Sequence, residues 1–263
     1  MIIRKSPAEI DKIRISCQIL GELLDLLAEK IMPGVSTWDL DAFAYDFIIK
    51  NGAKPAFKGY QVPGLSPFPS TLCTSLNSVI VHGFPSKKVI LKEGDIISID
   101  VGAIKDGYYS DAARTYAVGT ISPDAQRLME VTLNALYKGI EAAIPGNRVG
   151  DISNAIGTYV ASMGYYVADD LTGHGVGRYL HEEPQIPNAG SAGHGPRLQP
   201  GMTLAIEPMV NIGTNRVKEN GWEFSVADGT LSAHFEHTIL ITDSQPEILT
   251  VAKGERGCVK QVL

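Results

Sequence analysis

The segment Leu91-Lys-Glu-Gly-Asp-Ile-Ile-Ser-Ile-Asp100 aligns with Leu198-Gln-Pro-Gly-Met-Thr-Leu-Ala-Ile-Glu207, and each copy ends in a carboxylate. His82-Gly-Phe-Pro85 is echoed in the same way by His181-Glu-Glu-Pro184. Internal repeats of this kind predict two related halves. A two-fold arrangement of these halves would bring carboxylates from both to one place. A cluster of buried, charged carboxylates is stable only if cations bind between them.

The expected order of elements is also used twice, two helices followed by strands. Ser6-Pro7 and Ser122-Pro123 each combine a serine N-cap with proline in the first turn, which is typical of a helix start. The second helix of each half is expected over about 36–51 and 149–163. Alternation of apolar and polar residues then predicts strands, most clearly over 95–101.

Composition indicates an ordinary globular enzyme, with 263 residues, 44% hydrophobic and 20% charged. No linker or low-complexity segment separates the halves, so we expect a single catalytic domain over 1–263 with pseudo-symmetric halves of about 1–121 and 122–263. The net charge of -6 and the lack of a basic block do not favour a dominant interaction with nucleic acid.

The sequence favours a cytoplasmic protein. Its N-terminus lacks the apolar core of a signal peptide, and no uninterrupted apolar run reaches membrane-spanning length. Cys17, Cys73 and Cys258 are widely scattered and form no CxxC motif, which fits reduced thiols better than a disulfide framework or a zinc knuckle.

Four acids and one histidine, each in or beside a strand-like or glycine-rich stretch, are candidate metal ligands. Two carboxylates 4 Å apart repel by about 4 kcal/mol at an effective dielectric constant of about 20, so such a cluster binds protons or cations. Two divalent ions would balance four acids. Ligands rich in oxygen favour Mn, Fe(II) or Co over a closed structural zinc site, and a pair of such ions hydrolyses amides or esters. The candidates are Asp100, Asp111, His174, Glu207 and Glu236.

Each of these residues also has a purely structural interpretation. An aspartate at a strand end is usually a cap or a salt-bridge partner, and His174, between glycines, could belong to a simple turn. His82 and His181 could be hydrogen-bonded structural histidines. The corresponding positions of Asp100 and Glu207 in the two halves favour the metal site, although a duplication that kept structural acids is the alternative.

Eight motifs distributed over essentially the whole chain resemble those of methionine aminopeptidases, specifically the short bacterial type I form in subfamily A of peptidase family M24. The resemblance implies an α+β pita-bread fold, in which a curved antiparallel sheet is backed by two helix pairs around a pseudo-two-fold axis. The motifs are Cys73-Thr-Ser-Leu-Asn77, His82-Gly-Phe-Pro85, Ser98-Ile-Asp-Val101, Ser110-Asp111, Gly173-His-Gly-Val-Gly177, His181-Glu-Glu-Pro184, Ile206-Glu-Pro208 and Phe235-Glu-His-Thr238.

The resemblance also implies a role for each ligand. Asp100 looks like the bidentate ligand of one ion, Asp111 and Glu236 like bridges between two ions, and His174 and Glu207 like ligands of the second. The expected cofactors are two divalent ions, with Co, Mn, Fe(II) and Zn as candidates.

The implied reaction is attack of a water or hydroxide that bridges the two metals on the carbonyl of the scissile bond. Glu207 is the expected proton shuttle, His181 the donor to the developing oxyanion, and His82 the contact of the scissile nitrogen or its carbonyl. The substrate would be a nascent polypeptide with a deformylated N-terminal methionine followed by a small residue. Transient ribosome association, no membrane and a monomeric state are expected.

Methionine selectivity requires an apolar pocket for an unbranched thioether, and Tyr60, Phe68, Cys73 and Trp222 are its expected walls. The chain departs from common bacterial relatives here. The loop between Tyr60 and Cys73 is several residues longer, Phe68 replaces a frequent tyrosine, and Leu180 replaces a frequent aromatic residue. These changes leave the metal ligands intact but bear on side-chain preference.

Three other classes of protein compete with this interpretation. Prolidases and aminopeptidase P cleave Xaa-Pro bonds on the same fold, but they usually carry a substantial N-terminal domain, and only residues 1–99 precede the first ligand here. A type II enzyme would need an insertion for which the segment between His181 and Glu207 leaves no room. A non-catalytic binding protein on this fold would have lost metal ligands. Retention of two divalent ions, with loss of function on chelation, separates the enzyme from the binding protein.

Overall fold

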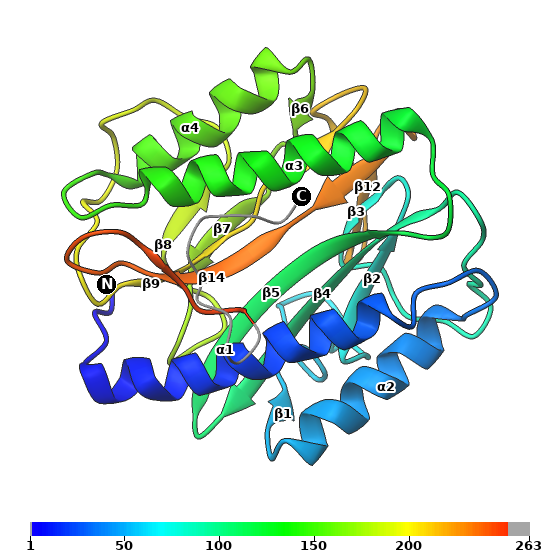
Figure 1. The fold of residues 1–263 in the computed structure, drawn as a ribbon, viewed down its shortest axis with the longest axis horizontal. Helices are drawn as coiled ribbons and strands as arrows, with labels where there is room; N and C mark the ends of the chain where they lie inside the picture. The colour runs from blue at the N-terminus through cyan, green and yellow to red at the C-terminus, as the bar shows by residue number, and fades with distance from the viewer. Residues whose placement is uncertain (1, 252–263) are drawn as a thin grey trace.

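Two pairs of helices pack on one face of a curved, mostly antiparallel sheet, with one pair from each half of the chain (Figure 1). The computed structural model describes residues 2–251. Helices α1 and α2 lie over the first half of the sheet, and α3 and α4 over the second. Their bounds are α1 Pro7–Ala28, α2 Thr37–Lys50, α3 Pro123–Ala142 and α4 Val149–Ser162.

The main sheet joins the two halves through the antiparallel pair β5 and β14. Its path is β1-β4-β5-β14-β9-β7-β8, with β2 paired to β4 and β15 paired to β14. The bounds of its strands are β1 Lys54–Pro55, β2 Leu72–Leu76, β4 Ile96–Lys105, β5 Tyr108–Ala117, β7 Thr172–Gly175, β8 Glu182–Pro187, β9 Thr203–Ile206, β14 Glu236–Leu240 and β15 Glu247–Ile248.

Two small three-stranded sheets flank the main sheet, in the orders β13-β10-β6 and β11-β12-β3. Each combines strands that are distant in sequence, and the second of them joins β3 of the first half to β12 of the second. The bounds of these strands are β3 Val79–Val81, β6 Tyr166–Val167, β10 Met209–Asn211, β11 Val217–Asn220, β12 Glu223–Val226 and β13 Ser232–His234.

The helix starts are those predicted from the sequence. Ser6 and Glu9 form a capping box at α1, since Glu9 accepts from the Ser6 backbone N–H at 2.8 Å. Ser36 accepts from the backbone N–H of Asp39, and Ser122 from that of Ala125, at 3.2 Å each. These contacts satisfy backbone donors that a helix N-terminus leaves free.

Strand β4 separates the hydrophobic core from the opposite face of the sheet. Ile97, Ile99 and Val101 are fully buried against α1 and α2. Because side chains alternate along a strand, Ser98 and Asp100 project from the other face. The helices therefore cover one side of the sheet and leave the other available for a site.

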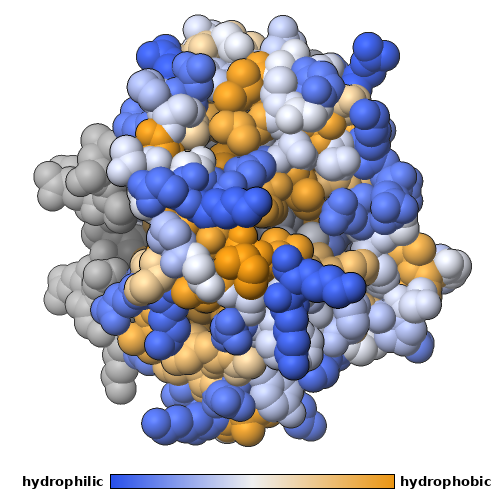
Figure 2. Space-filling model, turned by 90° about the vertical axis from the view of Figure 1, so that its right-hand side faces the viewer, coloured by the Kyte–Doolittle hydropathy of each residue, from blue (hydrophilic) through white to orange (hydrophobic). Residues whose placement is uncertain are grey.

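None of the helices within residues 2–251 combines the length and apolar character needed to cross a bilayer. Figure 2 shows one face of the molecule, where hydrophobic side chains gather near the centre and polar ones surround them. Cys17 and Cys73 are buried free thiols, and Cys258 lies outside the described residues.

A buried ion pair holds the N-terminal segment against the second half of the chain. Lys5 Nζ lies 2.6 Å from Glu182 Oε2, and the two side chains are only 1% and 2% exposed. Glu182 Oε1 accepts from the backbone N–H groups of Arg178 at 2.6 Å and Tyr179 at 3.0 Å. Lys5 thus neutralises a carboxylate that orders the turn directly before His181.

We expect Lys5→Met to lower the free energy of unfolding by about 3 to 5 kcal/mol, because it leaves the Glu182 carboxylate buried without its partner. Urea unfolding of the two proteins measures the difference. Lys138→Met is the matched control, since Lys138 and Glu141 are each 50% exposed and such a pair contributes about 1 kcal/mol or less. Equal losses in the two variants would contradict a structural role for the Lys5 pair.

Candidate metal centre and active site

The strand register brings all five predicted ligands onto one face of the main sheet. Ala113 of β5 lies opposite both Asp100 of β4 and Glu236 of β14, so the two acids flank a small residue. Asp111 lies opposite Gly102, two residues along β4 from Asp100 and on the same face.

Strand pairing in the second half of the chain positions the remaining candidate ligands on the same face of the sheet. His174 of β7 lies opposite Ala205 of β9, and Glu207 follows Ala205 by two residues. Ala205 also lies opposite Thr238, which is two residues after Glu236. These side chains therefore share one face, and the small Ala205 leaves room between them.

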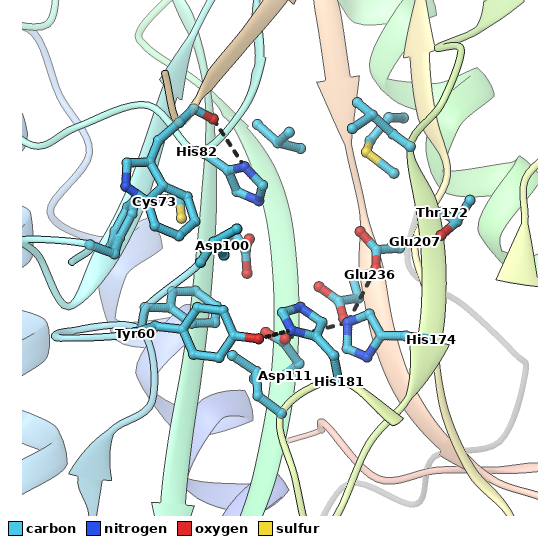
Figure 3. A pocket seen from close by; sticks show the side chains of 18 of the residues that line it. Tyr60, Cys73, His82, Asp100, Asp111, Thr172, His174, His181, Glu207 and Glu236 are labelled. Carbon is cyan, nitrogen blue, oxygen red and sulfur yellow. Dashed lines mark hydrogen bonds and ion pairs between the residues drawn. The ribbon is translucent and has the colours of Figure 1, made fainter. Parts of the chain in front are cut away.

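The five side chains converge at the floor of a pocket, where the labelled carboxylates and His174 point toward one another (Figure 3). His174 Nε2 lies 3.7 Å from Asp111 Oδ2 and 3.5 Å from Glu207 Oε1. His174 Nδ1 lies 2.9 Å from the carbonyl oxygen of Gly175. Because a carbonyl only accepts, Nδ1 carries the proton in the neutral ring, and the lone pair of Nε2 faces the carboxylates.

Burial strongly disfavours negative charge at these acids. It raises the pKa of Asp100 to about 7, with the charge of Glu207 adding to the rise, and it raises the pKa of Glu207 to about 8. Burial and the neighbouring carboxylates raise the pKa values of Asp111 and Glu236 well above their ordinary range. Burial lowers the pKa of His174 to about 3, so its ring is neutral near pH 7.

The donor set fits divalent cations. Asp100 Oδ1, Asp111 Oδ1 and Glu236 Oε1 are buried and have no hydrogen-bond partner among residues 2–251. Buried polar atoms are nearly always paired, so these oxygens and the lone pair of His174 require a proton or a cation between them. Carboxylate oxygens with imidazole nitrogen are ligands for borderline and hard ions.

The two repeated histidines both reach this pocket. His82 Nδ1 lies 3.1 Å from the carbonyl oxygen of Trp222, and burial lowers the pKa of His82 to about 4. His181 Nδ1 lies 2.7 Å from the hydroxyl of Tyr60, and its ring centre is 4.5 Å from that of His174. Although His181 is partly exposed to solvent, partial burial of its ring disfavours the charged form and lowers its pKa.

The predicted methionine pocket surrounds this floor with a volume of about 510 Å³. The ring of Phe68 packs edge-on against that of Trp222, at 5.4 Å between ring centres. Trp222 Nε1 donates to the carbonyl oxygen of Ser66 at 2.8 Å, which ties the long loop to the opposite wall. Tyr60, Phe68, Cys73 and Trp222 all line the pocket.

Two residues of the site, Phe57 and His234, were not among the residues expected there. Phe57 is a buried pocket wall, and it packs with Phe68, Cys73 and Leu180, whose effect on the pocket was anticipated. Gly102 leaves room for Phe57, because a Cβ at Gly102 would lie 2.7 Å from the Phe57 ring. No local sequence pattern indicates that Phe57 is a pocket wall.

The other missed residue is His234, whose Nε2 lies 3.4 Å from Glu207 Oε2. Its spacing of two residues from Glu236 was a usable signal, since side chains two apart in extended chain share a face. Burial lowers the pKa of His234, while the charge of Asp100 partly offsets this effect.

The model of metallopeptidase family M24 matches residues 11–243. The chain belongs to this family. Its M24 relatives include a methionine aminopeptidase of Clostridium acetobutylicum, which is 50% identical over 255 residues, with 96% of this chain and 100% of the relative covered. The expected family is thereby confirmed.

Solved M24 structures confirm the pita-bread fold. The methionine aminopeptidase of Thermotoga maritima superposes with a TM-score of 0.92 at 46% identity, covering 95% of this chain and 100% of that chain. A prolidase of Pyrococcus horikoshii gives a lower TM-score of 0.76 at 28% identity, and the match covers 97% of this chain but 65% of the prolidase. The likeness to methionine aminopeptidases is therefore the stronger of the two.

Proposed function

We propose that this chain is a metal-dependent aminopeptidase that removes the N-terminal methionine of nascent proteins when the second residue is small. The observation that carries the proposal is the convergence of four acids and His174 at the floor of a pocket with aromatic walls. Such a floor suits hydrolysis, and the walls suit an unbranched apolar side chain. The names and high identity of the relatives support the same activity.

We propose that the centre holds two divalent ions. Asp100 would bind one ion, His174 and Glu207 the other, and Asp111 and Glu236 both. Co, Mn, Fe(II) and Zn are the candidates, because the ligand set accepts borderline ions. Divalent ions held there would lower the pKa of water at the site and polarise the scissile carbonyl.

The hydrogen bonds of the two repeated histidines support different roles. Because His82 Nδ1 faces the carbonyl of Trp222, the neutral ring leaves Nε2 as an acceptor for the N–H of the scissile bond. Tyr60 can donate its hydroxyl proton to His181 Nδ1, which leaves the His181 Nε2–H as a donor to the developing oxyanion.

Glu207 is the proposed proton carrier. Its side chain is 12% exposed and lines the pocket floor, where its two oxygens lie 3.5 Å from His174 Nε2 and 3.4 Å from His234 Nε2. We propose that a Glu207 oxygen accepts a proton from the attacking water and delivers it to the leaving amine.

We expect Tyr60→Phe to lower kcat by roughly 2- to 10-fold with little change in KM. The phenyl ring keeps the pocket wall, while the hydrogen bond that orients His181 is lost, and one such bond contributes about 0.5 to 1.5 kcal/mol. Steady-state kinetics on a Met-Ala-Ser peptide gives both constants. Tyr45→Phe on the exposed side of α2 is the control, and a loss confined to KM would contradict the positioning role.

Peptide cleavage tests the proposed activity directly. Metal-free protein is incubated with Met-Ala-Ser and with Xaa-Pro peptides, alone and after addition of Mn, Fe(II) or Co, and products are identified by mass spectrometry. We expect metal-dependent release of methionine only. Cleavage of the Xaa-Pro peptides alone would replace the proposal with a prolidase-type activity, and no cleavage despite bound metal would overturn it.

We propose that residues 1–263 act as one catalytic domain, monomeric and cytoplasmic, in transient contact with the ribosome. The supply of ligands from both halves supports a single domain, because neither half holds the centre alone. Sedimentation of the purified protein tests the monomer, and co-sedimentation with translating ribosomes at low and high salt tests the transient contact. Cell fractionation tests the cytoplasmic location.

A further inference from the structure

His234 occupies the metal centre without a role in the proposed ligand set. It ends β13, two residues before Glu236, and is 1% exposed. Its Nε2 lies 3.4 Å from Glu207 Oε2 and has no hydrogen-bond partner within the described part of the chain. A buried imidazole nitrogen left unpaired beside carboxylates needs an explanation.

Each carboxylate oxygen of Glu207 faces a different histidine. His174 Nε2 approaches Oε1 at 3.5 Å, and His234 Nε2 approaches Oε2 at 3.4 Å. Asp111, His174 and Glu236 offer three ligand atoms within 4.8 Å of one another, and Glu207, His234 and Glu236 offer a second such group. Glu236 belongs to both groups, so two neighbouring cation positions would each have one imidazole.

We propose that His234 Nε2 is a metal ligand, so that each of the two neighbouring cation positions has an imidazole of its own. The proposal rests on the metal centre of the proposed function. Glu207, His234 and Glu236 each offer one ligand atom, and these three atoms lie within 4.8 Å of one another. His234 Nε2 can therefore complete the ligand set of a cation held by these two carboxylates.

A simple hydrogen bond to Glu207 explains the geometry less well. The separation of 3.4 Å is longer than the usual 2.7 to 3.2 Å of an N–H···O bond. A cation shared by His234, Glu207 and Glu236 satisfies all three groups at once. The added nitrogen ligand would shift the preference of the centre toward Fe(II), Co or Zn and away from Mn or Mg.

Nitrogen NMR of the full-length protein tests ligation directly. The protein is labelled with 15N-histidine and loaded with 113Cd, because a ring nitrogen bound to cadmium shows a scalar coupling to it. We expect coupling at two of the six histidines, His174 and His234, with the other four as internal controls. Coupling at His174 alone would overturn this inference but leave the metal centre intact. Coupling at no histidine would also overturn the proposed centre.

Metal competition provides a second readout that does not depend on activity. We expect His234→Gln to lose the second coupling and to weaken Co(II) binding at least tenfold more than Mn(II) binding, because the amide cannot replace the imidazole nitrogen. His194→Gln changes an exposed histidine away from the pocket and should leave both affinities unchanged. Equal losses for Co(II) and Mn(II) in His234→Gln would indicate an indirect effect through Glu207 and would overturn direct ligation.

Discussion

Asp111→Asn is expected to abolish methionine release, with kcat/KM lower by about 1000-fold or more. Asp111 Oδ2 faces His174 Nε2, and its other oxygen is buried without a partner among the described residues, so an amide there presents an N–H group to the cation site. Loss of groups that only orient metal ligands typically costs 10- to 100-fold, and loss of Asp111, which is proposed to contact both ions, should cost more.

The matched control for this variant lies on the same hairpin. Asp106 is exposed in the turn between β4 and β5 and has a positive φ of 50°, which asparagine tolerates well. Asp106→Asn should therefore retain full activity. Peptide cleavage by both variants, with bound metal measured in each, checks the prediction, and a loss below tenfold in Asp111→Asn would contradict the proposed role of Asp111.

The same substitution should stabilise the metal-free protein. Burial and the neighbouring acids raise the pKa of Asp111 well above its ordinary value, so the folded chain keeps a proton there that the unfolded chain releases. A neutral amide removes this cost, which amounts to about 1.4 kcal/mol for each pKa unit. A higher free energy of unfolding together with lost activity would show that Asp111 serves the reaction and not the stability of the fold.

The metal-free protein is expected to lose stability between pH 7 and pH 8. Asp111 and Glu236 have pKa values raised well above the ordinary range, and burial raises the pKa of Glu207 to about 8, whereas these groups ionise near pH 4 in the unfolded chain. The folded state therefore binds more protons than the unfolded state in this window. Stability falls by about 1.4 kcal/mol per pH unit for each proton so held.

Between pH 7 and pH 8 the buried histidines contribute little to the pH dependence of stability. Burial lowers the pKa of His82 to about 4 and that of His174 to about 3, so these rings take up protons preferentially in the unfolded state below about pH 6.5. That effect opposes the carboxyl effect at low pH but is absent above pH 7. A falling free energy of unfolding from pH 7 to 8 thus reports the acids.

Urea unfolding at pH 7.0, 7.5 and 8.0, with and without added Mn(II) or Co(II), measures this dependence. Cations should raise stability and flatten the slope, because they replace the retained protons. Asp111→Asn should show a shallower slope than the unsubstituted protein. A slope of zero without metal would mean that the acids are compensated by groups other than cations.

Much of the fold could be predicted from local patterns. Serine caps followed by proline predicted the starts of α1 and α3. Alternation over 95–101 predicted a strand, which the structure shows as β4. These features depend on backbone dihedral preferences and side-chain periodicity, which act over a few residues.

The candidate site was harder to predict because its contacts join distant segments. Tyr60 reaches His181, and Trp222 reaches the carbonyl of Ser66, from loops and turns of different halves. The proposed role of His234 depends on the position of Glu207 just after β9. Chemical type marked the acids as candidates, but the distances between them depend on strand pairing.

The sequence by itself determined the helix order, the internal repeat and the five candidate ligand side chains, because each is expressed in local residue pattern and type. Only the tertiary structure decided that Ala113 lies opposite both Asp100 and Glu236, that Lys5 neutralises Glu182, and that the pocket includes Phe57. The physical reason is that strand register depends on burying the whole apolar face of the sheet under the helices. A shift of the strand pairing by one residue would turn the acids toward the hydrophobic core.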